Sequence, residues 1–351
     1  MPTTTLPAVN GSAPASPKLL LPDLYSPIAA ELAEVERLLK AELRSDYPFV
    51  DELVRYGCLL GGKRLRPALL LLSAKASAGR VSQAHLTLAT VVEMIHTATL
   101  VHDDVLDEAV LRRHLATVNA RWDNEASVLL GDFLFSHAFY LASTLDNVLG
   151  CRLIGRATNI VCEGELRQKG SRGNFGLSEG EYLEIIEAKT AELTAVSCRL
   201  GALFAGATGE VEHQLDGFGR DLGIAFQIAD DLLDVQGEEQ STGKSLGTDL
   251  EKQKPTLPII RALELATPAD RASILEILTA REGEAGGFEQ RAEPRSHALA
   301  PYLERYDALV YARGRGRAFA QRARQRLEVL APSQSRDVLA AMTEFVMSRN
   351  T

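Results

Sequence analysis

The sequence predicts an all-α protein, a large single-domain helical bundle around a deep central cavity. Apolar residues recur at three- and four-residue spacing through nearly the whole chain, and alternating strand patterns are nearly absent. The breakers between the periodic segments are short and polar, as at Gly61-Gly62. The predicted helices cover residues 27–44, 49–60, 65–78, 83–107, 123–146, 150–168, 179–207, 210–236, 255–266, 270–281 and 303–331.

Residues 21–351 are expected to form one domain, because no interior Pro/Gly/Ser-rich linker separates two self-sufficient apolar patterns. Residues 1–20 are expected to form a flexible tail, since Thr, Ser, Ala and Pro dominate the first 17 positions. A transit peptide should be rich in arginine, and the first arginine here is Arg37. The segment 281–302 lacks clear periodicity and is predicted to be a flexible loop.

The composition excludes several classes of protein. The 351 residues are 46% hydrophobic and 24% charged, which is the balance of a globular protein with ample material for a core. A net charge of −9 argues against nucleic acid as a partner, since phosphate backbones attract an excess of Lys and Arg. The four cysteines are far apart, so free thiols in a reducing, cytoplasmic compartment are expected. No apolar run approaches the roughly 18 residues that a membrane span needs.

Two predicted helices are apolar on most faces and should be central to the bundle, namely 83–102 and 217–235. The first ends in Asp103-Asp104-Val105-Leu106-Asp107, where a spacing of four places Asp103 and Asp107 on one face. Oxygen-only ligands suit a hard ion such as Mg²⁺, with Mn²⁺ able to substitute. Alone, such a motif is more often a solvated acidic helix end.

The second central helix ends in the same pattern, with Asp230, Asp231 and Asp234. Two identical triads at the ends of two core helices can face each other across a bundle cavity. Six carboxylates could be neutralised there by several divalent ions and a diphosphate. The pair of motifs therefore predicts a metal-clamped diphosphate site.

Basic and polar residues accompany both triads. Lys63 and Arg66 of the GGKRLRP segment are three positions apart and can converge. His96 lies two helical turns before Asp103, and Gln227 one turn before Asp230, so both are expected to face the cavity. Taken singly, each would more often be a solvated arginine or a satisfied core side chain. The remaining candidates are Arg112, Arg113, Lys189, Thr190, Lys244 and Lys254.

Over residues 25–350 these motifs resemble the trans-prenyltransferases known as polyprenyl synthetases. The resemblance rests on GGKRLRP (61–67), EMIHTATLVHDDVLDEAVLRR (93–113), GDFLF (131–135), EGE with Gln168 (163–168), EAKTAEL (187–193), GIAFQIADDLLD (223–234) and GKSLGTDLEKQKPTLP (243–258). It implies an all-α fold and a Mg²⁺-dependent head-to-tail condensation of isopentenyl diphosphate onto an allylic diphosphate. It also implies a homodimer.

The resemblance assigns a role to each candidate. The metal ligands would be Asp103, Asp107, Asp230 and Asp234, with Asp104 and Asp231 in support. The diphosphate of isopentenyl diphosphate would be held by Lys63, Arg66, His96 and Arg113. The allylic diphosphate would be bound and activated by Arg112, Lys189, Thr190, Gln227, Lys244 and Lys254. The family pattern continues RR-G-x-P-T, whereas this chain has Arg112-Arg113-His114-Leu115-Ala116-Thr117, so the local loop geometry is open.

Product length would depend on Thr99 and Ala98, four and five residues before Asp103. In the family a bulky aromatic there resembles a floor that stops growth at farnesyl length, and both residues are small. The expectation is a long-chain product, octaprenyl to decaprenyl, of the kind used for quinone side chains. Alternatives are a geranylgeranyl or farnesyl diphosphate synthase, and close helix packing as the only role of the two small residues.

Two further alternatives are an enzyme with the same ionisation chemistry and a protein of another class. A terpene cyclase resembles this chain at the first aspartate motif only, and its second metal motif normally carries Asn/Asp, Ser/Thr and Glu. A non-catalytic synthase subunit would have lost one aspartate motif or the GGKRLRP basics, and neither is lost. A peripheral membrane contact during product release is left open.

Overall fold

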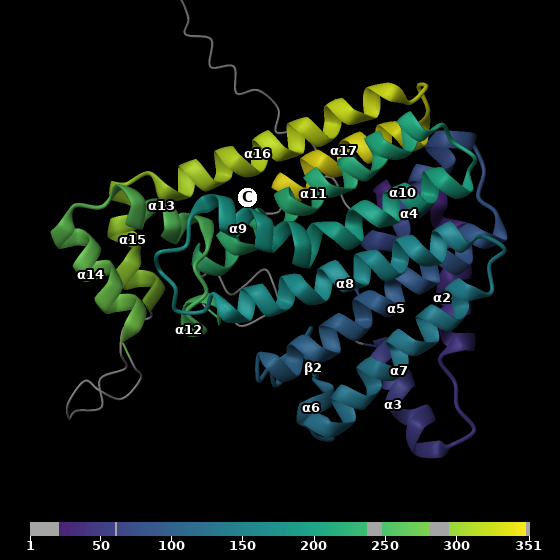
Figure 1. The fold of residues 1–351 in the computed structure, drawn as a ribbon, viewed down its shortest axis with the longest axis horizontal. Coiled ribbons are helices and arrows are strands. Elements are labelled where there is room, and N and C mark those ends of the chain that lie inside the picture. The colour runs from purple at the N-terminus through teal and green to yellow at the C-terminus, as the bar shows by residue number, and fades with distance from the viewer. Residues whose placement is uncertain (1–20, 60–61, 237–247, 281–294, 349–351) are drawn as a thin grey trace, which may run out of the picture.

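The computed structural model describes residues 21–59, 62–236, 248–280 and 295–348, and these form a bundle of long helices (Figure 1). The tail predicted for residues 1–20 lies outside the described residues. The first half of the chain supplies α1 (Leu21–Leu24), η1 (Ser26–Ile28), α2 (Ala29–Glu42), α3 (Pro48–Leu59), α4 (Leu65–Ala78), α5 (Gln83–Leu106), α6 (Val118–Arg121), α7 (Asn124–Ser143) and α8 (Val148–Gly170).

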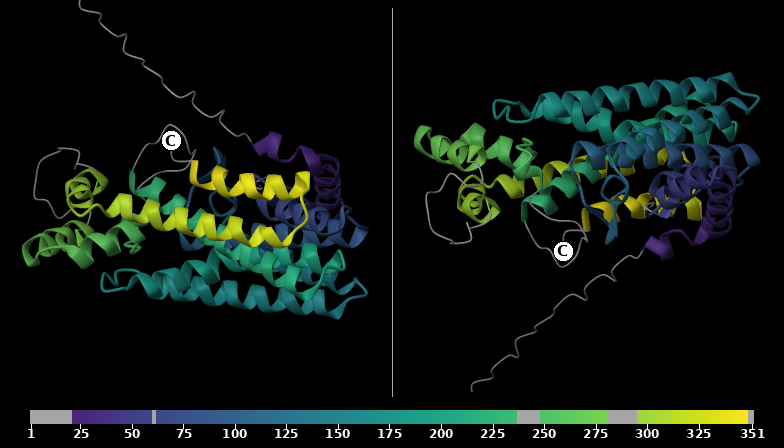
Figure 2. Two further views of the ribbon diagram at one scale, coloured as in Figure 1. Left: turned by 90° about the horizontal axis from the view of Figure 1, so that it is seen from above. Right: turned by 90° about the horizontal axis from the view of Figure 1, so that it is seen from below.

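The second half of the described chain is also helical. It contains α9 (Glu179–Ile186), η2 (Glu187–Ala191), α10 (Glu192–Phe204), α11 (Gly209–Gln236), α12 (Thr248–Glu251), α13 (Leu257–Leu265), α14 (Pro268–Thr279), α15 (Arg295–Arg305), α16 (Ala308–Arg326), η4 (Leu327–Val329) and α17 (Gln334–Ser348). The all-α prediction is confirmed. In Figure 2, α16 and α17 run side by side along the bundle.

The two helices predicted to be central are α5 and α11, and both are largely buried. On α5, Leu88, Val92, Ile95 and Ala98 are fully buried in the main core. A second, smaller core lies among α13, α14 and α15, at the end of the molecule shown on the left of Figure 1. Leu309 of α16 packs against both cores. The acidic ends of α5 and α11 are thereby fixed by tightly packed helix bodies.

One break in helical regularity bears on the site. Residues Glu187–Ala191 form a π-helical turn, η2, inside the continuous helix that begins with α9 and ends with α10. The backbone N–H of Glu192 donates to the Glu187 carbonyl, five residues earlier, which is the hydrogen bond of a π turn. The predicted helix 179–207 begins at the right residue and runs three residues too far, since α10 ends at Phe204. The extra residue of the π turn also changes which side chains face inward.

The loop predicted for 281–302 is wrong at its C-terminal end, because α15 begins at Arg295. Leu299 and Leu303 of this helix are buried in the smaller core, and an interior proline, Pro301, obscures the apolar periodicity in the sequence. Residues 281–294 lie outside the described residues. The sequence analysis also missed α17, whose Leu339, Met342 and Val346 belong to the main core.

The segment that departs from the family pattern forms a small β hairpin. Strands β1 (Leu111–Arg112) and β2 (Leu115–Ala116) pair antiparallel, with Leu111 opposite Ala116. The two turn residues, Arg113 and His114, both have positive φ, at 52° and 66°, as a type I′ turn requires. This turn explains how the chain dispenses with the glycine while keeping both arginines.

Within the described part of the chain, two helices have the length and hydropathy of a membrane span, α5 and α7. Of their most apolar windows, 67% and 44% respectively are buried inside the protein. A buried core helix passes the same test, so these helices do not indicate a membrane span.

Gly201 of α10 tests the packing of the core. A Cβ there would overlap the Leu70 carbonyl oxygen of α4 and lie 2.9 Å from Ser73 Cβ. We expect Gly201→Ala to lower the free energy of unfolding by about 1–3 kcal/mol, because backbone has to move. The matched control is Gly314→Ala on α16, where the Cβ meets open space and helix propensity should give about 0.5–1 kcal/mol of stability. Urea denaturation followed by circular dichroism measures both, and equal effects would contradict the packing described.

Candidate active site

The first aspartate motif occupies the C-terminal end of α5, and its three carboxylates have different surroundings. Asp103 and Asp107 line a small pocket together with residues of α8 and η2. Asp104, one position on, points into the protein and is only 1% exposed. Successive helical residues are separated by about 100°, which explains why the middle carboxylate leaves the face that the outer two share.

Asp107 is surrounded by cationic side chains from two other segments. Its carboxylate oxygens lie 2.9 Å from Arg172 Nη2, 3.2 Å from Lys252 Nζ and 3.8 Å from Lys254 Nζ. Burial acts to raise the pKa of Asp107, but the ammonium groups of Lys254 and Lys252 outweigh it and lower that pKa. Asp107 therefore remains an anion that any ligand must share with these cations.

Asp104 fixes Arg112 of the hairpin. The Arg112 guanidinium donates from Nε and Nη2 to Asp104 Oδ1 at 2.9 and 2.7 Å. Burial raises the pKa of Asp104, and the charge-assisted hydrogen bonds from Arg112 partly offset this effect. Asp104 thus positions an arginine and does not face the pocket.

The second motif shows the same division on α11. Asp231 is 5% exposed, and it accepts hydrogen bonds from Tyr182 Oη at 2.6 Å and from Gln227 Nε2 at 2.7 Å. Gln227 Oε1 in turn accepts from Thr190 Oγ1 at 2.8 Å. Burial, and then the nearby Asp249 carboxylate, raises the pKa of Asp231. The middle aspartate ties α9, η2 and α11 together.

Lys254 brings the ends of the two motif helices together. Its Nζ lies 3.8 Å from Asp107 of the first motif and 3.0 Å from Asp249 of α12. The Asp249 backbone N–H donates to Asp234 of the second motif at 3.0 Å. Asp230 and Asp234 are half-buried at this end of α11. The predicted facing of the two triads therefore agrees with these contacts.

Lys189 extends from the π turn into the pocket. Its Nζ donates to Glu165 Oε2 at 2.7 Å and to Gln168 Oε1 at 2.8 Å, and lies 3.6 Å from Asp103. Burial and the Asp103 carboxylate raise the pKa of Glu165 to about 7. The pocket has a volume of about 10 Å³, roughly the space for one water, so a substrate must displace side chains.

A second basic cluster surrounds the start of α4. Arg64 has a left-handed backbone, with φ of 50°, and its guanidinium pairs with Glu36 and, at 2.7 Å, with Glu93. Tyr25 Oη donates to the Lys63 carbonyl at 2.9 Å. These contacts fix the course of the GGKRLRP segment, whose first two residues are Gly61, outside the described residues, and Gly62.

Arg66, His96 and Arg113 converge in this second cluster. Burial holds the pKa of His96 well below its usual 6.5, and the charges of Arg66, Arg112 and Arg113 act in the same direction. The Arg113 guanidinium occupies the space beside Gly62 that a Cβ would fill. Arg66 Nε is buried without a hydrogen-bond partner. A cluster of cations with an unsatisfied buried donor is suited to bind an anion.

The chain matches the family model "Polyprenyl synthetase" over residues 47–293. It belongs to the polyprenyl synthetase family. It is 35% identical over 325 residues to the octaprenyl diphosphate synthase of Escherichia coli K12, covering 92% of this chain and 97% of that protein. A decaprenyl diphosphate synthase structure from Rhodobacter capsulatus matches with a TM-score of 0.86 and 34% identity, covering 95% of this chain and 100% of that chain.

A further structure, a polyprenyl synthase from Caulobacter crescentus complexed with calcium and isoprenyl diphosphate, matches with a TM-score of 0.87 and 33% identity. The match covers 96% of this chain and 100% of that one. Family membership makes this chain a prenyltransferase with isoprenoid diphosphate substrates. The resemblance drawn from the sequence motifs is confirmed.

The donor set suits the divalent metal on which polyprenyl synthetases depend. Asp103 and Asp107 offer hard carboxylate oxygens on one face of α5. Asp234 of the second motif accepts a hydrogen bond from the Asp249 backbone, and Lys254 links Asp249 to Asp107. Among the described residues, no three His, Cys, Asp or Glu side chains already converge on one point. Mg²⁺ commonly completes its shell with water and phosphate oxygens, so an aspartate pair on each helix fits such an ion.

The structure places most of the predicted site residues in these two clusters. Lys244 lies outside the described residues. Ala98 is fully buried on α5, and Thr99 donates from Oγ1 to the His96 carbonyl at 2.8 Å. The roles predicted for the individual residues stay predictions. The sequence analysis gave no role to five neighbours of the carboxylates and Lys189: Glu165, Gln168, Arg172, Tyr182 and Lys252.

We predict that His96 is neutral at pH 7 in the free protein and gains a proton when an anion binds beside it. Burial and four arginines disfavour the imidazolium, and a diphosphate would supply compensating negative charge. Nitrogen-15 histidine spectra across a pH series measure this, and the His96→Gln variant identifies the signal. Inorganic pyrophosphate should raise the pKa of His96. A pKa that pyrophosphate leaves unchanged would remove His96 from the anion site.

Proposed function

We propose that this chain is an all-trans polyprenyl diphosphate synthase that makes long-chain products, octaprenyl to decaprenyl. The observation that supports this best is the pairing of two anion-binding clusters along one helix. His96 of the second cluster and Asp103 of the first stand two turns apart on α5. One cluster would bind the allylic diphosphate and the other isopentenyl diphosphate.

The allylic diphosphate would bind between the two aspartate motifs. Lys189 and Lys254 now contact carboxylates, and they would turn toward the phosphate oxygens when the substrate enters. Arg112, fixed by Asp104, and Thr190, fixed by Gln227, present further donors in defined positions. Preorganised donors of this kind stabilise the negative charge that develops on a leaving group.

Asp103, Asp107, Asp230 and Asp234 would hold Mg²⁺, which when bound would supply Lewis-acid stabilisation of the departing diphosphate. Lys63, Arg66, His96 and Arg113 would orient isopentenyl diphosphate so that its double bond attacks the allylic carbon. Loss of a proton from the adduct then gives a longer allylic diphosphate. The released diphosphate is a plausible acceptor for that proton, so no protein base is required.

Water must be kept from the allylic cation, and the buried aliphatic side chains of α5 serve this purpose. Ile95 and Val92 stand one and two turns beyond Ala98, and all three are fully buried. The growing chain would pass Ala98 and Thr99, where no aromatic side chain stops it. A geranylgeranyl or farnesyl product is the alternative if neighbouring helices close the path sooner.

The chain also retains both aspartate motifs and the GGKRLRP basics, which argues against a non-catalytic subunit. We propose a homodimer that works in the cytoplasm. Large apolar side chains exposed on α7 and α8 support the dimer, because burial of exposed apolar surface favours association. They are Val128, Leu129, Tyr140, Val148, Leu149 and Leu166.

Product length tests this proposal. With labelled isopentenyl diphosphate and a dimethylallyl primer, the wild-type protein should give products of eight to ten isoprene units, the octaprenyl to decaprenyl range. Ala98→Phe should shift them to farnesyl or geranylgeranyl length, because the ring fills the path beside the first motif. The control for the added ring must lie outside the core, which excludes buried alanines of α5 such as Ala89.

Ala318→Phe, at an exposed position of α16, controls for the added ring and should leave product length unchanged. Thin-layer chromatography of the dephosphorylated products gives the readout. The long-chain proposal fails if the wild type stops at farnesyl diphosphate. The tunnel argument fails if Ala98→Phe makes the same long product.

A further inference from the structure

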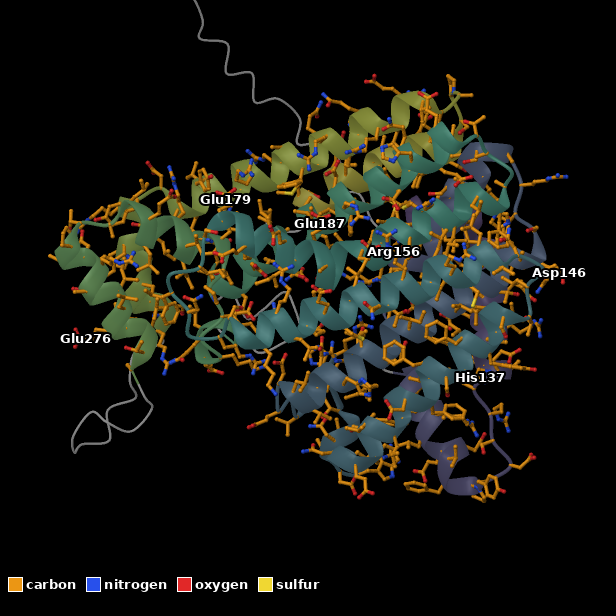
Figure 3. The ribbon with its side chains drawn as sticks, viewed as in Figure 1. His137, Asp146, Arg156, Glu179, Glu187 and Glu276 are labelled. Carbon is orange, nitrogen blue, oxygen red and sulfur yellow. The ribbon has the colours of Figure 1, made fainter. Side chains whose placement is uncertain are left out.

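A charged groove lies along one face of the π turn, the face opposite to the one that carries Lys189 and Thr190. Its volume is about 530 Å³, and its walls come from α8, α9, η2, α10 and α11. Glu187 and Arg156, labelled in Figure 3, line it from η2 and from α8. The same π turn therefore has one face in the active site, through Lys189 and Thr190, and one face in this groove.

Arg220 of α11 joins the two ends of the π turn from within this groove. Its Nη1 donates to Glu187 at 3.1 Å and to Glu192 at 2.6 Å, while Nη2 donates to Asp216 at 3.2 Å. Glu187 and Glu192 are also the two residues joined by the backbone hydrogen bond that defines the π turn. The Arg220 guanidinium thus bridges the carboxylates of Glu187, the first residue of the turn, and Glu192, the residue after it.

The turn is tightly confined on both sides by helix backbones. A Cβ on Gly164 of α8 would lie 2.5 Å from the Lys189 backbone nitrogen. A Cβ on Gly223 of α11 would lie 2.6 Å from Ala191 Cα. Glycine at both positions lets the two helices approach the extra residue closely, so the turn has little room to shift without losing these contacts.

Without Arg220, two carboxylates that share one nitrogen would repel each other across the turn. A π turn is intrinsically less favourable than α-helix and is retained mainly at functional positions. Relaxation by one residue would rotate side chains by about 100°, which would carry Lys189 and Thr190 away from Glu165, Gln168 and Gln227.

We propose that Arg220 is a positioning residue for the allylic site, acting through the π turn on Lys189 and Thr190. This inference rests on the proposed assignment of those two residues to the allylic diphosphate. Arg220 itself has no contact with the aspartate motifs in any interaction described above. Its effect should therefore fall on the allylic substrate and spare the isopentenyl site around Arg66.

The test compares Arg220→Gln with Arg167→Gln in the full-length protein. Arg167 lines the same groove and pairs with Glu184 at 2.6 Å, but that pair does not bridge the turn. We expect Arg220→Gln to raise the KM for the allylic diphosphate or to lower kcat by about tenfold or more. The KM for isopentenyl diphosphate should stay within about twofold, and Arg167→Gln should change neither KM nor kcat by more than that.

Glu187→Gln provides a milder variant, because Glu187 is 43% exposed and its loss leaves Glu192 paired with Arg220. It should act in the same direction as Arg220→Gln and by less. Hydrogen exchange of the Glu192 backbone amide should accelerate in Arg220→Gln, whether or not the allylic assignment is right. We call the bridge from Arg220 to Glu187 and Glu192 the clamp. The exchange measurement shows whether the clamp stabilises the π turn, independently of the proposed function.

Unchanged exchange at Glu192 would overturn the clamp. Equal rises in both KM values with a lowered melting temperature would also overturn the proposal, since that pattern reflects general destabilisation. Faster exchange with wild-type kinetics would retain the clamp and reject its link to the allylic site.

Discussion

The structure depends on neutralising six aspartates at the ends of two buried helices. Two carboxylates 4 Å apart repel by about 4 kcal/mol at an effective dielectric constant of 20, so each needs a partner. The middle aspartate of each motif is satisfied inside the protein, Asp104 by Arg112 and Asp231 by Tyr182 and Gln227. The outer aspartates of the first motif instead contact lysines and an arginine, as Asp107 does with Arg172.

This division separates a buried carboxylate from two that line the pocket within the first motif. The buried middle carboxylates hold the hairpin and the π turn, which carry Arg112 and Thr190 into the site. The outer carboxylates of the first motif instead pair with lysine ammonium groups, which a diphosphate could attract away. Exchange of partners, from Lys–Asp pairs to Lys–phosphate and metal–Asp pairs, would keep charge balanced as the substrate enters.

The sequence predicted the features that depend on local periodicity and repeated motifs. The apolar faces of α5 and α11 identified them as central, and their acidic ends proved to lie close together through Lys254 and Asp249. Pairs remote in sequence were not predictable this way. Tyr182 reaches Asp231 over 49 positions and Arg172 reaches Asp107 over 65, and neither spacing follows from a helix repeat.

Local irregularities of the backbone could not be predicted from the apolar periodicity either. The π turn keeps an apolar periodicity close to that of an α-helix, so the extra residue at Glu187–Ala191 is hidden in the sequence. The hairpin turn places arginine and histidine at positive φ, where glycine or asparagine is usual, so its type could not be inferred from composition. In α15, Pro301 and polar residues conceal the two buried leucines.

We expect metal and diphosphate to bind here together, because a diphosphate would draw away the protein cations that neutralise the first aspartate motif and so free its carboxylates for the metal. Titration calorimetry of inorganic pyrophosphate into the full-length protein, with Mg²⁺ and with EDTA, tests it most directly. We expect at least about tenfold tighter pyrophosphate binding with Mg²⁺, and linkage requires that pyrophosphate strengthen Mg²⁺ binding by the same factor. Asp103→Asn should abolish that gain. Equal affinity with and without Mg²⁺ in the wild type would contradict the account.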